Sequence, residues 1–177
     1  YVPADSQVSN QTEVDFAGRR DISVKIQKSF FSGGKETMSM HTVAVMGLGV
    51  RGKIHLHGLL ENPDYYKVVG LCDIDEPKMK AVAEEYHLDD VPLFTDAEEM
   101  LKETRPEIFV FVTYPDLRLS VIQLAVKYGV KGISFEKPMA ESLQEAKKIV
   151  KLCHDNGIKA VVCHQQKYLS QMQTLKK

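Results

Sequence analysis

The stretch TVAVMGLGVRG, residues 42–52, decides the fold of this 177-residue chain. Its first half is a short apolar run with the composition of a buried strand, and its second half is a G-x-G-x-x-G turn. In a strand–turn–helix unit, the three glycines permit a tight turn, close approach of a pyrophosphate and close packing of the helix. The amides at the start of the helix then face the phosphates. The pattern predicts a dinucleotide site with contacts from Gly47, Gly49, Val50, Arg51 and Gly52.

A carboxylate follows the second apolar run. Asp73 lies 21 residues after the third glycine, where a carboxylate can accept hydrogen bonds from both hydroxyls of an adenine ribose and repel a 2′-phosphate. Ile74 comes next, and we expect both residues to contact the cofactor. Because residues 74–76 contain no arginine or serine for a phosphate, the sequence favours NAD over NADP. Lys78 and Arg51 leave NADP open as the alternative.

Short apolar runs continue to alternate with amphipathic stretches along the chain. Strands are expected at residues 42–46, 67–72, 92–94, 107–112, 131–135 and 158–163. Helices are expected from the glycine turn to Asn62-Pro63, over 76–86, from a capping box at Thr95 and Glu98, over 117–128 before Gly129, and over 142–155 before Gly157. This alternation predicts an α/β protein with a doubly wound parallel sheet, the Rossmann fold.

The pattern divides the chain into three parts. We expect a flexible or non-native extension at 1–40, the dinucleotide-binding domain at 41–165, and the start of a further domain at 166–177. Within the polar extension, which we expect to be disordered, only Ile22–Ile26 alternates as a half-buried strand does. A helical pattern begins near residue 170, and position 1 is tyrosine. These features indicate a fragment that lacks a second domain.

Composition narrows the classes of function. The chain carries 23 basic and 24 acidic residues, so it has no global field to attract nucleic acid or an anionic membrane. It contains no apolar run of roughly 20 residues to cross a bilayer, and it does not begin as a signal peptide does. Cys72, Cys153 and Cys163 stand in apolar or helical stretches, which is typical of buried thiols in a reducing compartment. We expect a cytoplasmic protein with a small-molecule substrate.

A second chemical element is ISFEKPMA, residues 133–140. Its charged pair follows a buried strand, at the carboxyl edge of the sheet where ligands bind in open α/β folds. Lys137 would there be partly desolvated and close to a cationic nicotinamide; both effects favour a neutral amine suited to proton exchange with a substrate hydroxyl. From spacing alone, an exposed loop lysine before a helix-initiating proline is an equally good interpretation.

Taken in order and spacing, residues 47–52, Asp73, Thr113 and Glu136-Lys137-Pro138 resemble the N-terminal half of the Gfo/Idh/MocA oxidoreductases. This family is named after glucose–fructose oxidoreductase, inositol dehydrogenase and a rhizopine-catabolism protein. The resemblance extends from residue 42 to about 177. It implies a longer, two-domain enzyme whose second half is an α/β domain with a large open sheet. That sheet would support substrate binding and the contacts of a homo-oligomer.

The resemblance also implies roles for individual residues. Lys137 matches the catalytic lysine that contacts both cofactor and substrate, Glu136 would border the nicotinamide pocket, and the Lys137–Pro138 bond is a candidate cis bond. Thr113 matches a cofactor-facing threonine. Four further candidates for cofactor contact are Tyr114, Pro115, Arg118 and Gln166.

His55 matches a histidine often found three residues after the last turn glycine. We expect it to be a packed helix histidine. The His55-x-His57 pair is a poor metal site because no cysteine or carboxylate stands at ligand spacing.

The chain departs from the family pattern in two loops. After Thr113 the proline is displaced by one position, and Arg118 stands where histidine is usual. After the last strand, residues 165–168 read Gln-Gln-Lys-Tyr where arginine and an aromatic residue are usual. Both departures concern the nicotinamide and substrate pocket and leave the pyrophosphate turn intact.

Three functions are consistent with these features. The resemblance implies an NAD-dependent dehydrogenase that transfers hydride between a sugar, polyol or related hydroxyl compound and nicotinamide. The family's remaining catalytic aspartate and histidine belong to the second half, so this chain alone is expected to be inactive. Arg118 and Lys167 suggest a non-catalytic dinucleotide sensor as an alternative, against which the retained Lys137 argues. A hydrolase or isomerase that uses NAD transiently is the third.

Overall fold

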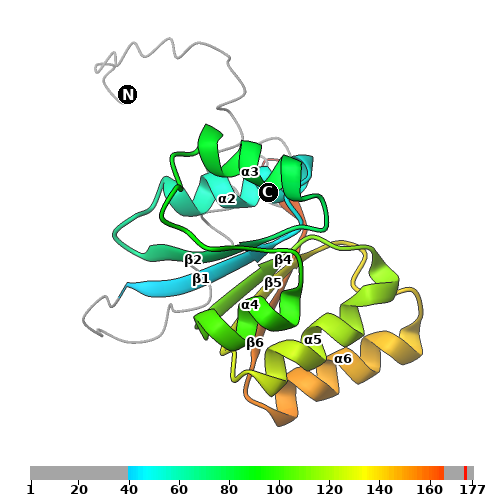
Figure 1. Cartoon of the computed structure of the whole chain (residues 1–177). Coiled ribbons are helices and arrows are strands. Elements are labelled where there is room, and N and C mark those ends of the chain that lie inside the picture. The colour runs from blue at the N-terminus through cyan, green and yellow to red at the C-terminus, as the bar shows by residue number, and fades with distance from the viewer. Residues whose placement is uncertain (1–39, 166–173, 175–177) are drawn as a thin grey trace, which may run out of the picture.

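A six-stranded parallel sheet forms the centre of the molecule (Figure 1). The computed structural model describes residues 40–165 and Thr174. The strands are β1 (His41–Met46), β2 (Tyr66–Cys72), β3 (Leu93–Phe94), β4 (Ile108–Phe111), β5 (Gly132–Glu136) and β6 (Lys159–Cys163). They lie in the order β3-β2-β1-β4-β5-β6, with every pairing parallel. The predicted Rossmann fold is confirmed, and the strand order reverses between β1 and β4.

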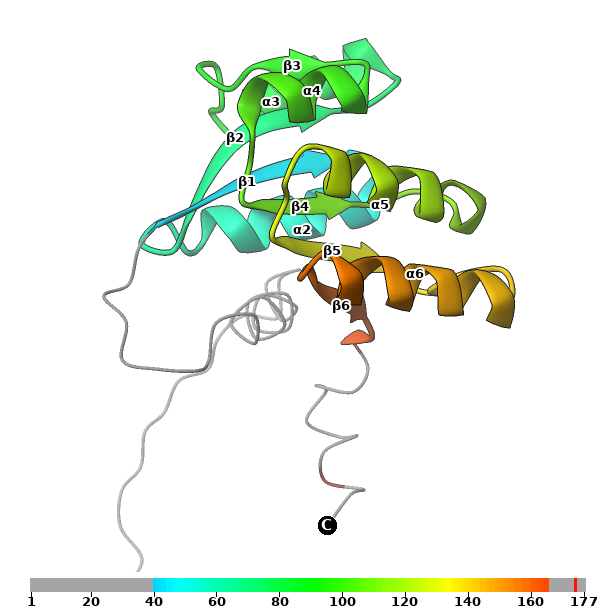
Figure 2. The same cartoon turned by 90° about the horizontal axis from the view of Figure 1, so that it is seen from below.

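Helices cover both faces of the sheet (Figure 2). The helices are α2 (Val50–Leu60), α3 (Glu76–Glu85), α4 (Ala97–Thr104), α5 (Arg118–Lys127), which follows a 3₁₀ turn at Pro115–Leu117, and α6 (Leu143–Asp155). Apolar side chains of α2 and α3 pack with one face of the sheet, and those of α4, α5 and α6 pack with the other. The predicted strand at 22–26 and Gln166 lie outside the described residues, as does the predicted last helix apart from Thr174.

Alternation within the strands divides the core into two layers. In β1, Val43 and Val45 belong to the layer under α2 and α3, whereas Ala44 belongs to the other. All four residues of β4 are buried. The rings of Phe111 and Phe135 stack with centroids 5.1 Å apart. The central strands β4 and β5 are therefore buried on both faces, as their continuous apolar runs predicted, whereas the edge strand β6 is partly exposed.

The helix ends follow the predicted signals with one exception. Gly129 and Gly157 have φ of +74° and +66°, the left-handed conformation that ends a helix. The predicted cap of α4 was wrong: Asp96, and not Thr95, accepts the capping hydrogen bond, from the backbone N–H of Glu99 at 2.8 Å. Because the helix begins at residue 97, the carboxylate of Asp96 stands directly before it and Thr95 lies one position too early.

Truncating the stacked core phenylalanine tests this packing. We expect Phe111→Ala to lower the free energy of unfolding by about 3–5 kcal/mol, because the side chain is fully buried. The measurement is urea unfolding followed by circular dichroism. Leu143→Ala, at a residue that is 72% exposed, should change the free energy of unfolding by no more than about 0.5 kcal/mol. Equal losses in the two variants would contradict the described core.

Candidate dinucleotide site

The three glycines of the turn meet different demands. Gly47 has φ of +84°, and a Cβ there would lie 2.2 Å from the carbonyl oxygen of Val112. A Cβ at Gly52 would lie 1.7 Å from the carbonyl oxygen of Gly47. At Gly49, in contrast, a Cβ would meet no described atom within 4 Å. The chain's own packing requires the first and third glycines, while the second leaves its backbone open to close approach by a ligand.

The start of α2 also differs from most other helix starts in the described chain. Side chains cap α3, α4 and α6, but Gly49 offers none, and the first turn of α2 contains no acidic residue. The first amides of an α-helix have no acceptor within the helix. The start of α2 therefore suits a bound anion such as a pyrophosphate.

Asp73 connects this turn to the end of β2. Its buried carboxylate accepts hydrogen bonds from the backbone N–H of Leu48 at 2.6 Å and of Asp75 at 3.0 Å, and the ammonium of Lys78 lies 2.9 Å away. Burial alone would raise the pKa of Asp73, but these donors outweigh it and lower the pKa. The predicted ribose-binding acid is thus an ionised carboxylate that also fixes the glycine turn, a contact that sequence reasoning missed.

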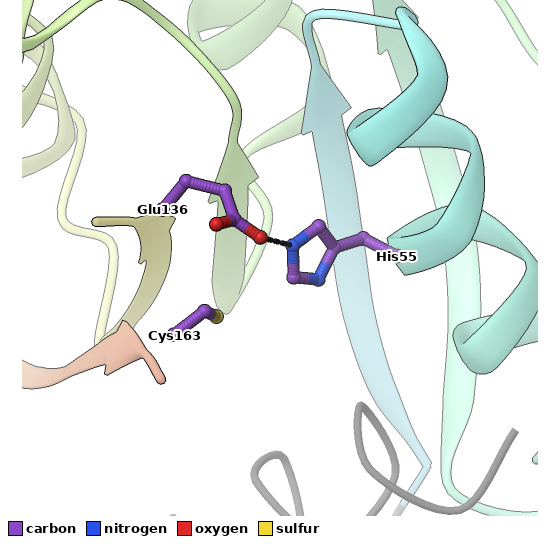
Figure 3. Close-up of side chains that lie close together, drawn as sticks. All are labelled: His55, Glu136 and Cys163. Carbon is purple, nitrogen blue, oxygen red and sulfur yellow. Dashed lines mark hydrogen bonds and ion pairs between the residues drawn. The ribbon is translucent and has the colours of Figure 1, made fainter. Parts of the chain in front are cut away.

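A second buried carboxylate lies at the end of β5. Glu136 lies 3.0 Å from Nε2 of His55 on α2, which Figure 3 shows directed at it, and it accepts a hydrogen bond from Gln165 at 2.6 Å. Burial would raise the pKa of Glu136, but His55, the charge of Arg51 and Gln165 together lower it. Since an ionised carboxylate only accepts, Nε2 of His55 carries the hydrogen. His55 is buried as predicted, and its partner Glu136 was not foreseen.

Arg51 acts electrostatically on this second carboxylate. Its charge lowers the pKa of Glu136, whereas Lys78 is the cation that lowers the pKa of Asp73. The Arg51 side chain is exposed at the start of α2. Its contact with a cofactor stays a prediction.

His55, Glu136 and Cys163 bring three possible metal-ligand atoms within 4.8 Å of one another (Figure 3). Their nitrogen, oxygen and sulfur donors are of the kinds that zinc binds. Burial raises the pKa of Cys163 to about 11, and its sulfur lies 3.3 Å from the hydroxyl of Ser134. Glu136 already accepts two hydrogen bonds and has the cation Arg51 nearby. We interpret the group as a hydrogen-bonded cluster.

Lys137 stands directly after β5 at the carboxyl edge. The Lys137–Pro138 peptide bond is cis, as the family resemblance implied. The lysine itself is exposed, so the described part of the chain does not supply the partial burial that we expected. Its contact with a cofactor and its catalytic role stay predictions.

Arg118 lies beneath the two loops at this edge. Its side chain is buried, with 1% exposure, and its Nη2 donates to the carbonyl oxygens of Thr113 at 3.4 Å and Lys137 at 3.3 Å. The guanidinium lies over the ring of Phe135, 5.6 Å from the centroid. Its Nε and Nη1, and the hydroxyl of Thr113, have no partner among the described residues. The geometry gives Arg118 a supporting position under the loops, and its direct contact with a cofactor stays a prediction.

Three large apolar side chains are exposed where neighbouring strands end. Val50 is 80% exposed after β1, Ile74 90% after β2 and Tyr114 80% after β4. Pro115 begins the 3₁₀ turn that follows and is half-buried. Exposed apolar groups beside polar groups are typical of sites that bury planar rings. Together with the glycine turn and Asp73 at the point of strand reversal, they define a dinucleotide-binding Rossmann domain.

The comparison with protein families also indicates a dinucleotide-binding Rossmann domain. Residues 41–164 match the Gfo/Idh/MocA family, described as an oxidoreductase family with an NAD-binding Rossmann fold. The chain belongs to this family of oxidoreductases. The resemblance inferred from the glycine turn and Glu136-Lys137-Pro138 is confirmed.

Individual relatives are distant. An uncharacterized protein of Saccharomyces cerevisiae is 26% identical over 133 residues, which cover 75% of this chain and 38% of the relative. The 4-hydroxy-tetrahydrodipicolinate reductase of Bacillus pumilus is 22% identical over 127 residues, covering 71% of this chain and 47% of the reductase. The chain thus spans less than half the length of these relatives.

A solved structure supports the fold. The WlbA dehydrogenase of Bordetella pertussis, crystallised with NADH and UDP-GlcNAcA, superposes with a TM-score of 0.70 at 22% identity, over 78% of this chain and 41% of that one. In residues 40–165, no helix has the length and apolar character needed to cross a membrane.

The contrast between the glycines can be tested directly. We expect Gly52→Ala to destabilise the chain by about 3 kcal/mol or more, because its Cβ overlaps a backbone oxygen. Gly49→Ala should keep stability within about 1 kcal/mol and weaken NADH binding by about tenfold or more, as measured by NADH fluorescence. Unchanged NADH affinity in Gly49→Ala would contradict the assigned role.

Arg118 offers a second test. A buried charge with unsatisfied N–H groups is costly, so we expect Arg118→Met to unfold at the same or a higher urea concentration. The loops at Thr113 and Lys137 should become less ordered, so NADH affinity should fall severalfold. Affinity for adenosine 5′-phosphate, which lacks the nicotinamide, should stay constant. Calorimetric titration with both ligands separates the two ends of the site. Parallel loss of both affinities would refute the supporting role.

Proposed function

We propose that this chain is the cofactor-holding part of an NAD-dependent oxidoreductase that acts on a sugar, a polyol or a related hydroxyl compound. The observation that carries the proposal is the shared position of three elements at one edge of the sheet. These are the open backbone at Gly49, the ionised carboxylate of Asp73, and Glu136-Lys137 with its cis-proline. Family membership supports the reaction class.

The proposed cofactor position follows the order of the strands. The pyrophosphate would lie at the start of α2, against Gly49, Val50 and Arg51. The adenine ribose would lie beside Asp73 and Ile74 at the end of β2. The nicotinamide would then lie toward the ends of β4 and β5, with contacts from Thr113, Tyr114, Pro115 and Glu136. Gln166 remains a further candidate for contact with this end.

In the proposed reaction, bound NAD supplies the hydride acceptor. The protein's own contribution is to position the substrate and to move a proton. Lys137 is the candidate to accept the proton of the substrate hydroxyl, directly beside the buried anion of Glu136. His55 and Gln165 hold Glu136 in place, so the negative charge beside Lys137 has a fixed position. A second domain would exclude water from Lys137 and supply the remaining catalytic groups.

The direction of hydride transfer has a second candidate. A relative that matches 71% of the chain is named a reductase, which supports transfer from reduced cofactor to substrate. The same arrangement serves in both directions, since a group that accepts a proton in one direction returns it in the other. A reductase is therefore the runner-up, ahead of the non-catalytic sensor and the hydrolase or isomerase.

Two further features belong to the same proposal. A cytoplasmic location is supported by three buried, unpaired cysteines, Cys72, Cys153 and Cys163. Assembly into a homo-oligomer is implied by the family resemblance.

The catalytic role of Lys137 gives the decisive measurement. In the full-length gene product, we expect Lys137→Met to lower kcat for NADH formation by about 10²–10⁴-fold with a panel of sugars and polyols. NADH affinity should stay within about threefold.

Lys131→Met is the matched control, because that lysine is 76% exposed and lies at the opposite end of β5. Lys131→Met should leave kcat and NADH affinity unchanged. Cofactor binding without turnover on any hydroxyl or carbonyl substrate, in the wild type as in Lys137→Met, would favour the sensor.

A further inference from the structure

The carboxylate that would meet the adenine ribose already has a cation bound to it. Lys78, on the first turn of α3, places its ammonium 2.9 Å from Oδ1 of Asp73. The Asp73 side chain is only 5% exposed, whereas that of Lys78 is 40% exposed. The ammonium therefore lies at the rim of the site, between the buried carboxylate and solvent.

This ion pair changes what the rim can bind. An unpaired carboxylate at this position excludes a ribose 2′-phosphate by repulsion between two anions. Here the charge of Asp73 is balanced by Lys78. An ammonium has three N–H donors and sits on a flexible stem, so it can hold a carboxylate oxygen and still donate to phosphate oxygens.

Two acidic side chains next to Lys78 in the sequence have contacts of their own. Asp75 caps α3 by accepting the backbone N–H of Lys78 at 3.1 Å. Glu76 pairs with Lys80 at 2.6 Å. Lys78 is therefore the cation of α3 that contacts Asp73, beside the exposed side chain of Ile74.

We propose that the adenosine end of this site accepts a ribose 2′-phosphate as well as a free 2′-hydroxyl, and that Lys78 is the residue that permits it. The inference rests on the proposed dinucleotide function and extends it from NAD to both cofactors. With a free hydroxyl, Lys78 stays on Asp73 and the ribose shares the carboxylate. With a 2′-phosphate, Lys78 lies between the two anions and reduces the repulsion between them.

Two small probes isolate this end of the site. Adenosine 5′-phosphate and adenosine 2′,5′-bisphosphate differ only in the 2′-phosphate, and calorimetric titration of the whole chain gives the affinity for each. We expect Lys78→Met to weaken binding of the bisphosphate by about tenfold and binding of the monophosphate by less than about twofold. Lys78→Arg should retain bisphosphate binding. Raising the salt concentration should weaken the bisphosphate more than the monophosphate, because screening acts on the added charge.

Lys80→Met is the matched control. Lys80 lies on the same helix and pairs with Glu76, so its removal takes away the same net charge without touching Asp73. It should leave the ratio of the two affinities unchanged. Urea unfolding of all three variants checks that α3 stays folded.

Each outcome has a distinct meaning. A selective loss of bisphosphate affinity in Lys78→Met alone supports the inference. Wild-type binding of the monophosphate with no measurable binding of the bisphosphate overturns it and leaves the NAD-dependent function standing. The same holds if Lys78→Met and Lys80→Met change the ratio equally. If neither the probes nor NADH and NADPH bind, the proposed function fails together with the inference.

Discussion

The hydrogen bond from the backbone N–H of Leu48 to the buried carboxylate of Asp73, 2.6 Å long, joins two parts of the proposed cofactor site. It connects the glycine turn after β1 to the end of β2, the neighbouring strand in the sheet. The turn itself is tightly packed, because Gly47 and Gly52 approach backbone oxygens too closely to tolerate a Cβ. The contact therefore connects the turn that leads into α2 to the end of β2. An ionised acid at Asp73 is thus part of the fold as well as part of the site.

Helix α2 is fixed a second time, farther along its length. His55 reaches across the sheet edge to Glu136 at the end of β5, and Gln165 holds the same carboxylate from the segment after β6. The helix therefore spans the point of strand reversal with one buried anion on each side. Asp73 lies at the end of β2, where we propose that the adenosine binds, and Glu136 lies beside Lys137, the candidate for proton transfer. This arrangement fixes the separation of the two proposed parts of the site.

Much of this could be predicted from the sequence, and the remainder has a common physical cause. The strands, the helices between them and the glycine turn could be predicted from local patterns, because apolar periodicity and turn chemistry act over a few residues. Asp73 was predicted from its spacing to the glycine turn, and Lys137 from its place directly after a buried strand and from the family resemblance. The contacts Leu48–Asp73 and His55–Glu136 were missed because they join residues 25 and 81 positions apart. The exposure of Lys137 depends on what covers it in three dimensions, and the one-residue error at Asp96 reflects the imprecision of helix boundaries.

The buried guanidinium of Arg118 has a consequence for how this edge of the molecule can diversify. It donates hydrogen bonds to the carbonyl groups of Thr113 and Lys137, while the side chain of Tyr114, next to Thr113, is exposed. The backbone of the two loops is therefore defined independently of the side chains that they display. The displayed residues, and with them the compounds that are recognised, can change while the backbone of the two loops is retained. In protein engineering, position 114 is accordingly the first place to randomise, and position 118 is one to keep.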